Sequence, residues 1–408
     1  MVKETKIGLK ENSKQFALLV LVNGFVGAMI GLERTIFPQF AEEHFGVIAY
    51  SAVLSFIVAF GFSKAAANYV SGKLANRFGR KNILIVGWCI AISVPILLLF
   101  AETWSVVILS NILLGISQGF TWSSTVVMKI DLVGEKDRGF AMGLNEFAGY
   151  FAVGVMAFVT GWLATEYGVK PYPFYLGIAI AIIGLLLSWI FVRDTYHFVN
   201  QEEQTNSIDA HKNVFIETTF KNKTLSSVTQ AGLVNNLNDG MIWGLLPIVL
   251  LYFQFSLEQI GLAVAVYPAV WGIGQLFTGK MSDHFSKKKM LFWGMLLQGA
   301  AILVMAKSND YVILVLLSAV LGLGTALVYP TFLSAIAGAT RPQQRAESIG
   351  VFRLWRDSGY AFGALLSGIV ADAFGVTVAM LLIGLITILS AVVIQVRMPS
   401  DEGYLHKI

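Results

Sequence analysis

The chain carries the same basic, glycine-bracketed turn twice, 207 residues apart. The first copy, residues 72–81, reads GKLANRFGRK, and the second copy, residues 279–288, reads GKMSDHFSKK. The same offset pairs Gly115 with Gly322, so one shift aligns separate stretches of the sequence. A chain that repeats at half its length, with apolar runs between the repeated turns, is typical of a transporter built from two similar halves.

The composition indicates a protein that crosses a membrane many times. Of the 408 residues, 56% are hydrophobic and only 13% are charged, against roughly 45–50% and about 25% in soluble domains. Runs of about twenty apolar residues are long enough to cross a hydrocarbon core of about 30 Å. We therefore predict an all-α polytopic membrane protein.

Twelve such runs can be placed, six in each half of the chain. The predicted spans are residues 16–38, 47–71, 82–100, 105–128, 141–165 and 173–192, then 225–253, 259–279, 290–306, 311–336, 347–371 and 376–396. The polar stretch between the two sets reads as a linker. We predict an N-terminal half at 1–192, a cytoplasmic linker at 193–224 and a C-terminal half at 225–408.

The distribution of positive charge predicts the orientation. Of the 29 Lys and Arg residues, 23 fall on the side of the two termini and four fall within spans, and only Lys170 and Lys307 fall in loops on the other side. This bias places both termini in the cytoplasm, because Lys and Arg near span ends resist translocation. Topology thus explains the net charge of +4, and we expect no nucleic-acid partner.

The sequence offers no chemistry for an enzyme or a metal site. It has one cysteine, Cys89, and five scattered histidines without metal-ligand spacing. No nucleophile–base pair is apparent on the polar spans, and no Walker pattern is present, which excludes direct drive by ATP. We expect no cofactor, no metal and no enzymatic activity.

The charges inside the predicted spans are the first candidates for function. An ionisable side chain at the centre of a membrane costs about 2.5–3.5 kcal/mol on the mildest scale and normally faces protein or water. The candidates are Glu33, Arg34, Lys64, Glu146, Asp239, Arg353, Arg356 and Asp357. Each of them either serves transport or braces neighbouring helices.

Buried amides form a second set of candidates, because an amide in hydrocarbon needs a hydrogen-bonding partner. They are Gln118, Asn145, Asn235 and Asn238. The sequence leaves open whether they hold helices together or line a wetted site.

The repeated turn resembles the signature loop between helices 2 and 3 of the major facilitator superfamily. Its first copy supplies Gly72, Arg77, Gly79, Arg80 and Lys81. The usual aspartate is replaced by Asn76, whereas the second copy keeps Asp283. In the family this loop helps hold the cytoplasmic side closed, so the resemblance implies a weaker latch here, or one that borrows Asp131 or Glu135.

The resemblance also implies the fold and the type of activity. Members of the family rock two six-helix halves around a central site, with helices 3, 6, 9 and 12 on the outside. In this chain, those four predicted spans carry none of the candidate charges. The arginine motif of helix 4 and the Gly-Pro of helix 5, which are typical of drug–proton antiporters, are absent.

We therefore predict a monomeric, proton-coupled secondary transporter of the bacterial inner membrane that moves a small polar or anionic organic solute by alternating access. A proton-driven multidrug efflux pump is the alternative. The candidate charges, four cations and four anions, do not decide the sign of the substrate. Proton coupling or gating is assigned to Glu146, Asp239, Lys64 and Asp357. Substrate binding is assigned to Glu33, Arg34, Gln118, Asn145, Asn235, Asn238, Arg353 and Arg356.

Three pairings are predicted among these residues. The 207-residue offset places Glu146 opposite Arg353, so movement of that cation is expected to load and release a proton on Glu146. Depth along helices 1 and 7 predicts a contact between Arg34 and Asp239. Asp357 is expected to pair either with Lys64, as a latch between the halves, or with Arg353 on its own helix.

Overall fold

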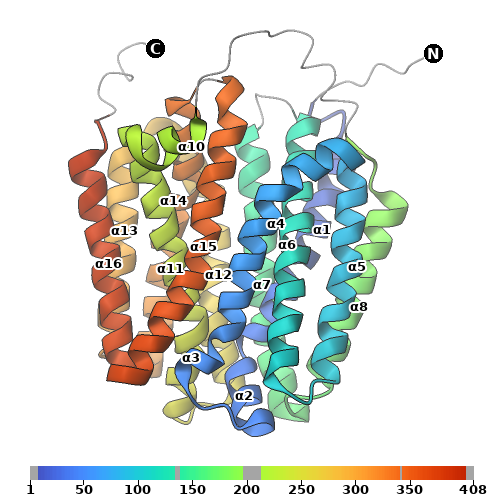
Figure 1. Ribbon diagram of the computed structural model, residues 1–408, viewed down its shortest axis with the longest axis vertical. Coiled ribbons are helices and arrows are strands. Elements are labelled where there is room, and N and C mark those ends of the chain that lie inside the picture. Colours follow the sequence, from blue (N-terminus) through green and yellow to red (C-terminus); the bar gives the residue numbers. More distant parts are fainter. Residues whose placement is uncertain (1–7, 134–137, 196–212, 341, 401–408) are drawn as a thin grey trace.

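The computed structural model describes residues 8–133, 138–195, 213–340 and 342–400. Within these ranges, the side chains of residues 72–77, 283–284 and a few others near helix ends are not described. The described chain is helical, and its long helices run side by side as one bundle (Figure 1). This confirms the all-α membrane fold.

The long helices fall into two sets of six. The first set is α1 (Ser13–Arg34), α4 (Ser55–Phe78), α5 (Arg80–Leu99), α6 (Trp104–Val133), α7 (Arg138–Tyr167) and α8 (Tyr172–Phe191). The second set is α11 (Lys223–Tyr252), α12 (Leu257–His284), α13 (Lys287–Met305), α14 (Tyr311–Ala339), α15 (Pro342–Phe374) and α16 (Val376–Arg397). Each predicted span corresponds to one of these helices.

Ten of the twelve are long and apolar enough to cross a membrane, counted over the described residues. The other two, α11 and α15, have the length but carry several polar side chains within the bundle. The share of polar groups is high because both helices lie in the middle of the protein, where neighbouring helices cover them. These two helices hold three of the buried charges discussed below.

The first predicted span ends earlier than expected, at Arg34, and is followed by the short helix α2 (Phe37–Phe45). Pro38 lies in the first turn of α2, where its missing N–H costs nothing. Gly46 ends α2 in a left-handed conformation, with φ of 63°. One further turn, α3 (Tyr50–Val53), precedes α4.

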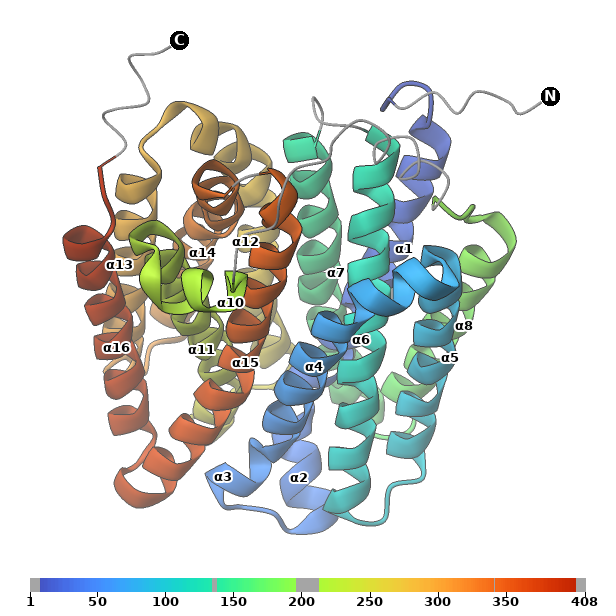
Figure 2. The same cartoon turned by 45° about the horizontal axis from the view of Figure 1, so that its top comes forward.

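Within the predicted linker, two short elements lie against the second half. They are α10 (Val214–Ile216) and the π-helix η2 (Glu217–Lys221). Figures 1 and 2 show α10 at the same end of the bundle as the start of α1 and the end of α16. We call this end the termini face and the opposite end, which carries α2 and α3, the α2 face.

The two halves meet along two seams. In one seam α4 packs on α15, and in the other α7 packs on α12. A Cβ at Gly61 would lie 2.6 Å from the backbone nitrogen of Ala361, and one at Gly154 would lie 2.7 Å from the carbonyl oxygen of Ala265. Glycine therefore lets the two halves approach almost backbone to backbone.

The helices predicted to face lipid lie at the two outer edges of the bundle. Figure 2 shows α5 and α8 at one edge, and α13 and α16 at the other. Large apolar side chains such as Trp189 on α8, Trp293 on α13 and Leu389 on α16 are exposed there. This surface suits lipid, whereas the buried charges lie on the helices between the two edges.

Helix packing gives a first prediction. A Cβ at Gly363 of α15 would lie 2.1 Å from the carbonyl oxygen of Leu237 on α11, whereas Gly350 of α15 has open space around it. Gly363→Ala should therefore lower the free energy of unfolding by about 1–3 kcal/mol through overpacking. Gly350→Ala is the control and should be neutral or stabilising by up to about 1 kcal/mol. Thermal unfolding in detergent measures both, and equal effects would contradict the packing.

Candidate functional site

Seven of the eight candidate charges are buried near the middle of the bundle. Only Arg353 is half-buried. The seven are Glu33 and Arg34 of α1, Lys64 of α4, Glu146 of α7, Asp239 of α11, and Arg356 and Asp357 of α15. Both halves contribute, so the charges lie around the place where the halves meet.

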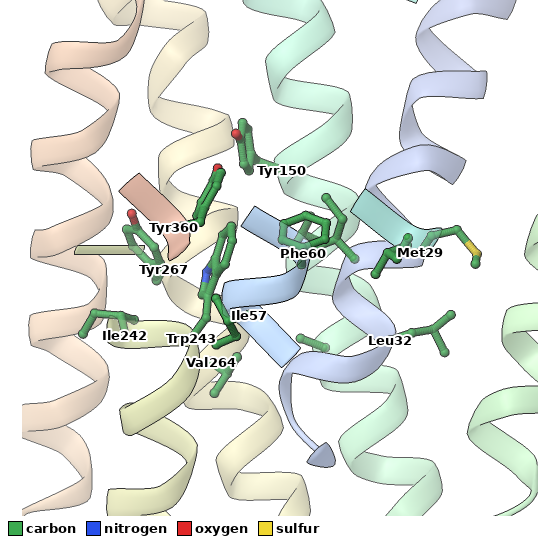
Figure 3. Close-up of a cluster of buried hydrophobic side chains, with 14 of the residues drawn as sticks. Met29, Leu32, Ile57, Phe60, Tyr150, Ile242, Trp243, Val264, Tyr267 and Tyr360 are labelled. Carbon is green, nitrogen blue, oxygen red and sulfur yellow. The ribbon is translucent and has the colours of Figure 1, made fainter. Parts of the chain in front are cut away.

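Arg34 lies against aromatic rings. Its guanidinium carbon is 4.1 Å from the ring centre of Trp243 on α11 and 5.3 Å from that of Phe60 on α4. Trp243 in turn stacks on Tyr360 of α15, with ring centres 4.9 Å apart (Figure 3). Arg34 has no ion-pair partner in the described chain, and its Nε and Nη1 atoms donate no hydrogen bond.

The predicted contact between Arg34 and Asp239 is not formed. Asp239 is fully buried and faces protein, and its Oδ1 accepts a hydrogen bond from the Tyr267 hydroxyl of α12. That hydroxyl also lies 3.2 Å from the Thr325 hydroxyl of α14. The aromatic faces of Trp243 and Phe60 occupy the position that an ion pair would have taken beside Arg34.

Lys64 lies among aromatic rings and shares the ring of Phe60 with Arg34. Its ammonium nitrogen lies 5.3 Å from the ring centres of Phe60, Trp122 and Tyr360. Three ring faces can stabilise a cation electrostatically. Lys64 and Asp357, the predicted latch, form no ion pair in this conformation, because other groups hydrogen-bond the carboxylate, but Asp357 acts electrostatically on Lys64.

Asp357 joins the two halves through a different residue. Its Oδ1 accepts hydrogen bonds of 2.8 and 2.5 Å from Nε and Nη2 of Arg356. Its Oδ2 accepts one of 2.6 Å from Asn68 of α4, four residues after Lys64. The predicted local pair with Arg353 is also not formed, since the adjacent arginine takes the carboxylate. Arg356 additionally donates to the Tyr329 hydroxyl of α14.

A second group of rings crosses the other seam. Tyr150 of α7 stacks on Trp271 of α12, with ring centres 3.5 Å apart. Trp122 of α6 continues the group on one side at 5.2 Å, and Tyr329 of α14 continues it on the other at 5.8 Å. The aromatic side chains thus connect helices of both halves around the buried charges.

Glu146 belongs to a network inside the first half. Its Oε1 accepts hydrogen bonds from Nε1 of Trp122, at 3.2 Å, and from Nδ2 of Asn145, at 2.8 Å. The amide oxygen of Asn145 accepts from the fully buried ammonium of Lys129 on α6. Arg353 was the expected partner of Glu146, but the two form no ion pair. The Arg353 side chain is half-buried on α15, whereas Glu146 is buried within the first half.

Glu33 forms no ion pair with Arg34, although the two neighbouring charges act on each other electrostatically. The side chain lies beside Asn111 of α6. Neither carboxylate oxygen accepts a hydrogen bond from the described residues.

The remaining amides favour the structural alternative. Gln118 donates to the carbonyl oxygen of Val26 at 2.8 Å and so joins α6 to α1. Asn238 donates to Gln298 of α13 at 3.0 Å and accepts from Thr387 of α16 at 2.6 Å. Asn235 donates to its neighbour Asn236. The contacts of Gln118 and Asn238 hold helices together within each half, whereas that of Asn235 stays within α11.

At the termini face, Arg80 of the repeated turn pairs with Asp131 of α6, with 3.0 Å between Nε and Oδ2. The backbone N–H of Lys81 donates to Asp194 at 2.9 Å, and Gly79 supplies the positive φ of 85° that this turn requires. Asp131 is therefore engaged by this turn. Gly72, Asn76, Arg77 and Asp283 lie outside the part of the chain whose side chains are described.

At the α2 face, Asp372 of α15 holds the first turn of α3 across the seam. Its two carboxylate oxygens accept from the backbone N–H groups of Tyr50, at 2.6 Å, and Ser51, at 2.9 Å. Burial opposes its ionisation, but the hydrogen bonds from Ser51 and Tyr50 prevail and lower the pKa of Asp372 below its ordinary value of 3.8. We call this contact the outer latch.

Several of these residues were not among the sequence candidates, including Lys129, Asn68 and Asp372. Lys129 was counted among the basic residues at the end of a span, and Asn68 was not considered. For Lys129 a signal existed, since Trp122, Thr125 and Lys129 recur at helical spacing and so share a face of α6. Asn68 carried no such signal, because its role depends on a residue in the other half.

The buried ion pair gives the second prediction. Removing one partner of a buried pair leaves a bare charge and costs about 3–5 kcal/mol. Arg356→Gln should therefore destabilise strongly, and Arg356→Gln/Asp357→Asn should recover most of the loss. Arg353→Gln on the same helix is the control and should have little effect. Thermal unfolding of the purified variants measures this, and a double variant no better than Arg356→Gln would contradict the pairing.

The outer latch gives the third prediction. Because the pKa of Asp372 is lowered in the latched form, the contact is present at neutral pH and is lost as pH falls through that lowered pKa. Asp372→Asn should weaken it at neutral pH. Spin labels at Ile48 and Phe374, both exposed on this face, should then report a longer, broader distance distribution. Glu102→Gln is the control, and an unchanged distribution in Asp372→Asn would argue against the latch.

Comparison with known proteins agrees with this architecture. The family model for the Major Facilitator Superfamily matches residues 17–229 and again residues 228–407. The proton-coupled antiporter flippase LtaA of Staphylococcus haemolyticus is 25% identical over 377 residues, which are 90% of this chain and 88% of that protein. The multidrug resistance protein MdtG of Enterobacter lignolyticus is 23% identical over the same shares of the two chains.

Solved structures share the fold. The human organic anion transporter MFSD10 superposes with a TM-score of 0.73 at 16% identity, covering 94% of this chain and 99% of that one. A POT family transporter in complex with a thioalcohol-conjugated peptide gives a TM-score of 0.76 at 13% identity, covering 94% and 96%. With one family model matching both halves and transporters among its relatives, this multi-pass membrane chain belongs to the Major Facilitator Superfamily of transporters.

Proposed function

We propose that this chain is a proton-coupled secondary transporter that carries a small organic anion across the bacterial inner membrane. It works by alternating access as a monomer, with the termini face in the cytoplasm. The basic residues near the ends of the spans support this orientation. The environment of Arg34 is the observation that favours an anion as the substrate.

Arg34 is a buried cation that forms no ion pair in the described chain, and of the carboxylates there only Glu33 and Asp239 offset its charge electrostatically. A buried carboxylic acid can become neutral by binding a proton, whereas arginine stays charged in proteins. The contact with Trp243 compensates part of this charge, but the free Nε and Nη1 donors remain without acceptors. A carboxylate or sulfonate supplies both the charge and two acceptors that match the planar guanidinium.

The surroundings fit the rest of such a solute. Lys64 adds a second buried cation without an ion pair in the described chain, and it shares the ring of Phe60 with Arg34. The neighbouring carboxylate, Asp357, is already neutralised by Arg356. Trp243 and Tyr360 provide flat apolar faces beside the cations. The substrate class that these groups favour is an organic anion with an apolar or aromatic body.

Proton coupling is supported by the carboxyl groups at the same level. Glu33, Glu146 and Asp239 are buried, and each has at least one carboxylate oxygen without a hydrogen bond. Such groups can exchange protons when the halves rock and their surroundings change. The LtaA relative is described as proton-coupled, which agrees with this assignment.

A multidrug exporter is the second candidate. The two aromatic groups around Trp243 and Trp271, together with the incompletely hydrogen-bonded carboxylates, could stabilise an apolar cation. The MdtG relatives are described as multidrug resistance proteins. The two candidates differ in the sign of the charge that the central site accepts.

Two solutes of matched size and opposite charge separate the candidates. Purified protein in liposomes would be tested with radiolabelled toluenesulfonate and trimethylphenylammonium, with and without an imposed pH gradient. We expect transport of toluenesulfonate that the gradient stimulates. Transport of trimethylphenylammonium alone would overturn the proposal in favour of the exporter.

The role of Arg34 gives the fourth prediction. Arg34→Lys keeps the charge but loses the planar fork, so we expect the half-saturation concentration for toluenesulfonate to rise by at least about tenfold, or about 1.4 kcal/mol. Arg353→Lys is the control and should leave it unchanged. A normal half-saturation concentration in Arg34→Lys would exclude direct recognition by this residue.

A further inference from the structure

A buried chain of four side chains in the first half has no counterpart among the contacts described for the second half. It runs from the Lys129 ammonium through the side-chain amide of Asn145 to the Glu146 carboxylate, which also accepts from Trp122. Lys129 is fully buried, and Glu146 is almost so. The two charged groups are therefore joined by an amide and make no direct ion pair.

Contacts from α1 and α6 hold the backbone of α7 at Asn145. Asn23 of α1 donates to the backbone carbonyl of Asn145 at 2.7 Å, and Thr125 of α6 donates to the side-chain oxygen of Asn23 at 2.9 Å. The side-chain amide of Asn145 presents its oxygen to Lys129 and its nitrogen to Glu146. In this orientation it stabilises a charged lysine and can donate to the carboxyl group in either protonation state.

One oxygen of the Glu146 carboxyl group has no hydrogen-bond partner among the described residues. Oε1 of Glu146 holds both hydrogen bonds, whereas Oε2 is buried and has no partner. An incompletely hydrogen-bonded carboxylate in the interior is costly unless it is neutralised. A proton on Oε2 leaves every existing hydrogen bond in place and changes the net charge of the Lys129–Glu146 pair from zero to plus one.

Other ionisable groups surround this site. Those that act electrostatically on Glu146 or share its surroundings are Lys64 of α4, Lys129 of α6, Tyr150 of α7 and Tyr329 of α14. Of these ionisable groups in the described chain, only Lys129 is linked to Glu146 through hydrogen bonds, by way of the Asn145 amide. Lys64 reaches it through Trp122, whose ring lies 5.3 Å from the Lys64 nitrogen while its N–H donates to Glu146.

We propose that Lys129, Asn145 and Glu146 form the proton-binding unit of the transporter, that it lies wholly in the first half, and that Trp122 separates it from the anion site. Glu146 binds and releases the proton at Oε2, and Lys129 and Asn145 are positioning residues that act through it. This assignment rests on the proposed function, and it replaces Arg353 with Lys129 as the cation that acts on Glu146.

Transport assays test the unit with toluenesulfonate as the probe. Glu146→Gln should keep counterflow of toluenesulfonate but lose its stimulation by a pH gradient. Lys129→Met should give the same result, because without the cation Glu146 stays neutral, and Lys129→Arg should retain coupling. Glu258→Gln, an exposed carboxylate in the first turn of α12 in the second half, is the control and should remain coupled. Stimulation that survives in Glu146→Gln or disappears in Glu258→Gln would overturn the proposal.

A substrate-free measurement keeps this test separate from that of the proposed function. Infrared difference spectra between acidic and neutral pH, recorded on protein in lipid nanodiscs, should show a protonated carboxyl band that Glu146→Gln abolishes and Glu258→Gln retains. The double variant Lys129→Met/Glu146→Gln should unfold at the same temperature as the unchanged protein, which shows that a loss of the band reflects titration and not misfolding. A band that persists in Glu146→Gln would overturn the assignment, even if toluenesulfonate proves not to be transported.

Discussion

The structure depends on how aromatic rings and one ion pair stabilise positive charges that are buried between the two halves. Arg34, Lys64 and Arg356 lie at the level where the halves meet, and each is placed against at least one aromatic ring. Only Arg356 also has an ion pair in the described chain. Cation–aromatic contacts of this kind contribute about 2 kcal/mol or more when desolvated, less than the several kcal/mol lost on burying an ion. The remaining cost supports the proposal that the substrate is an anion.

The same rings also hold the halves together. Trp243 and Tyr360 lie on adjacent helices of the second half, but Phe60, which completes their group, comes from the first. Tyr150 and Trp271 stack directly across the other seam. When the halves move apart on one side, these rings must separate, and the cations beside them lose part of their compensation. Cation binding by the rings and closure of the bundle are therefore coupled.

Much of the fold could be predicted from the sequence, because apolar runs and a repeat at half length leave few alternatives. The sequence also identified the buried charges within the spans, because an ionisable residue is conspicuous in an otherwise apolar run. Their partners were not predicted. Arg34 and Asp239 are at suitable depths and act on each other electrostatically, yet Arg34 lies against the Trp243 ring and Asp239 accepts from the Tyr267 hydroxyl. Depth follows from counting residues, whereas rotation depends on side-chain packing between helices.

The arrangement around Trp122 also bears on how a proton and an anion influence each other. Lys64 lies on the face of this indole, and Glu146 accepts a hydrogen bond from its edge. An anion beside Lys64 makes a proton on Glu146 more favourable, and by reciprocity that proton makes the anion bind more tightly. Direct electrostatics across Trp122 therefore favours binding of both together. Transport of the proton and the anion in opposite directions requires that the two not be carried together. Direct electrostatics across Trp122 does not achieve this, so the conformational change would have to separate the two binding events.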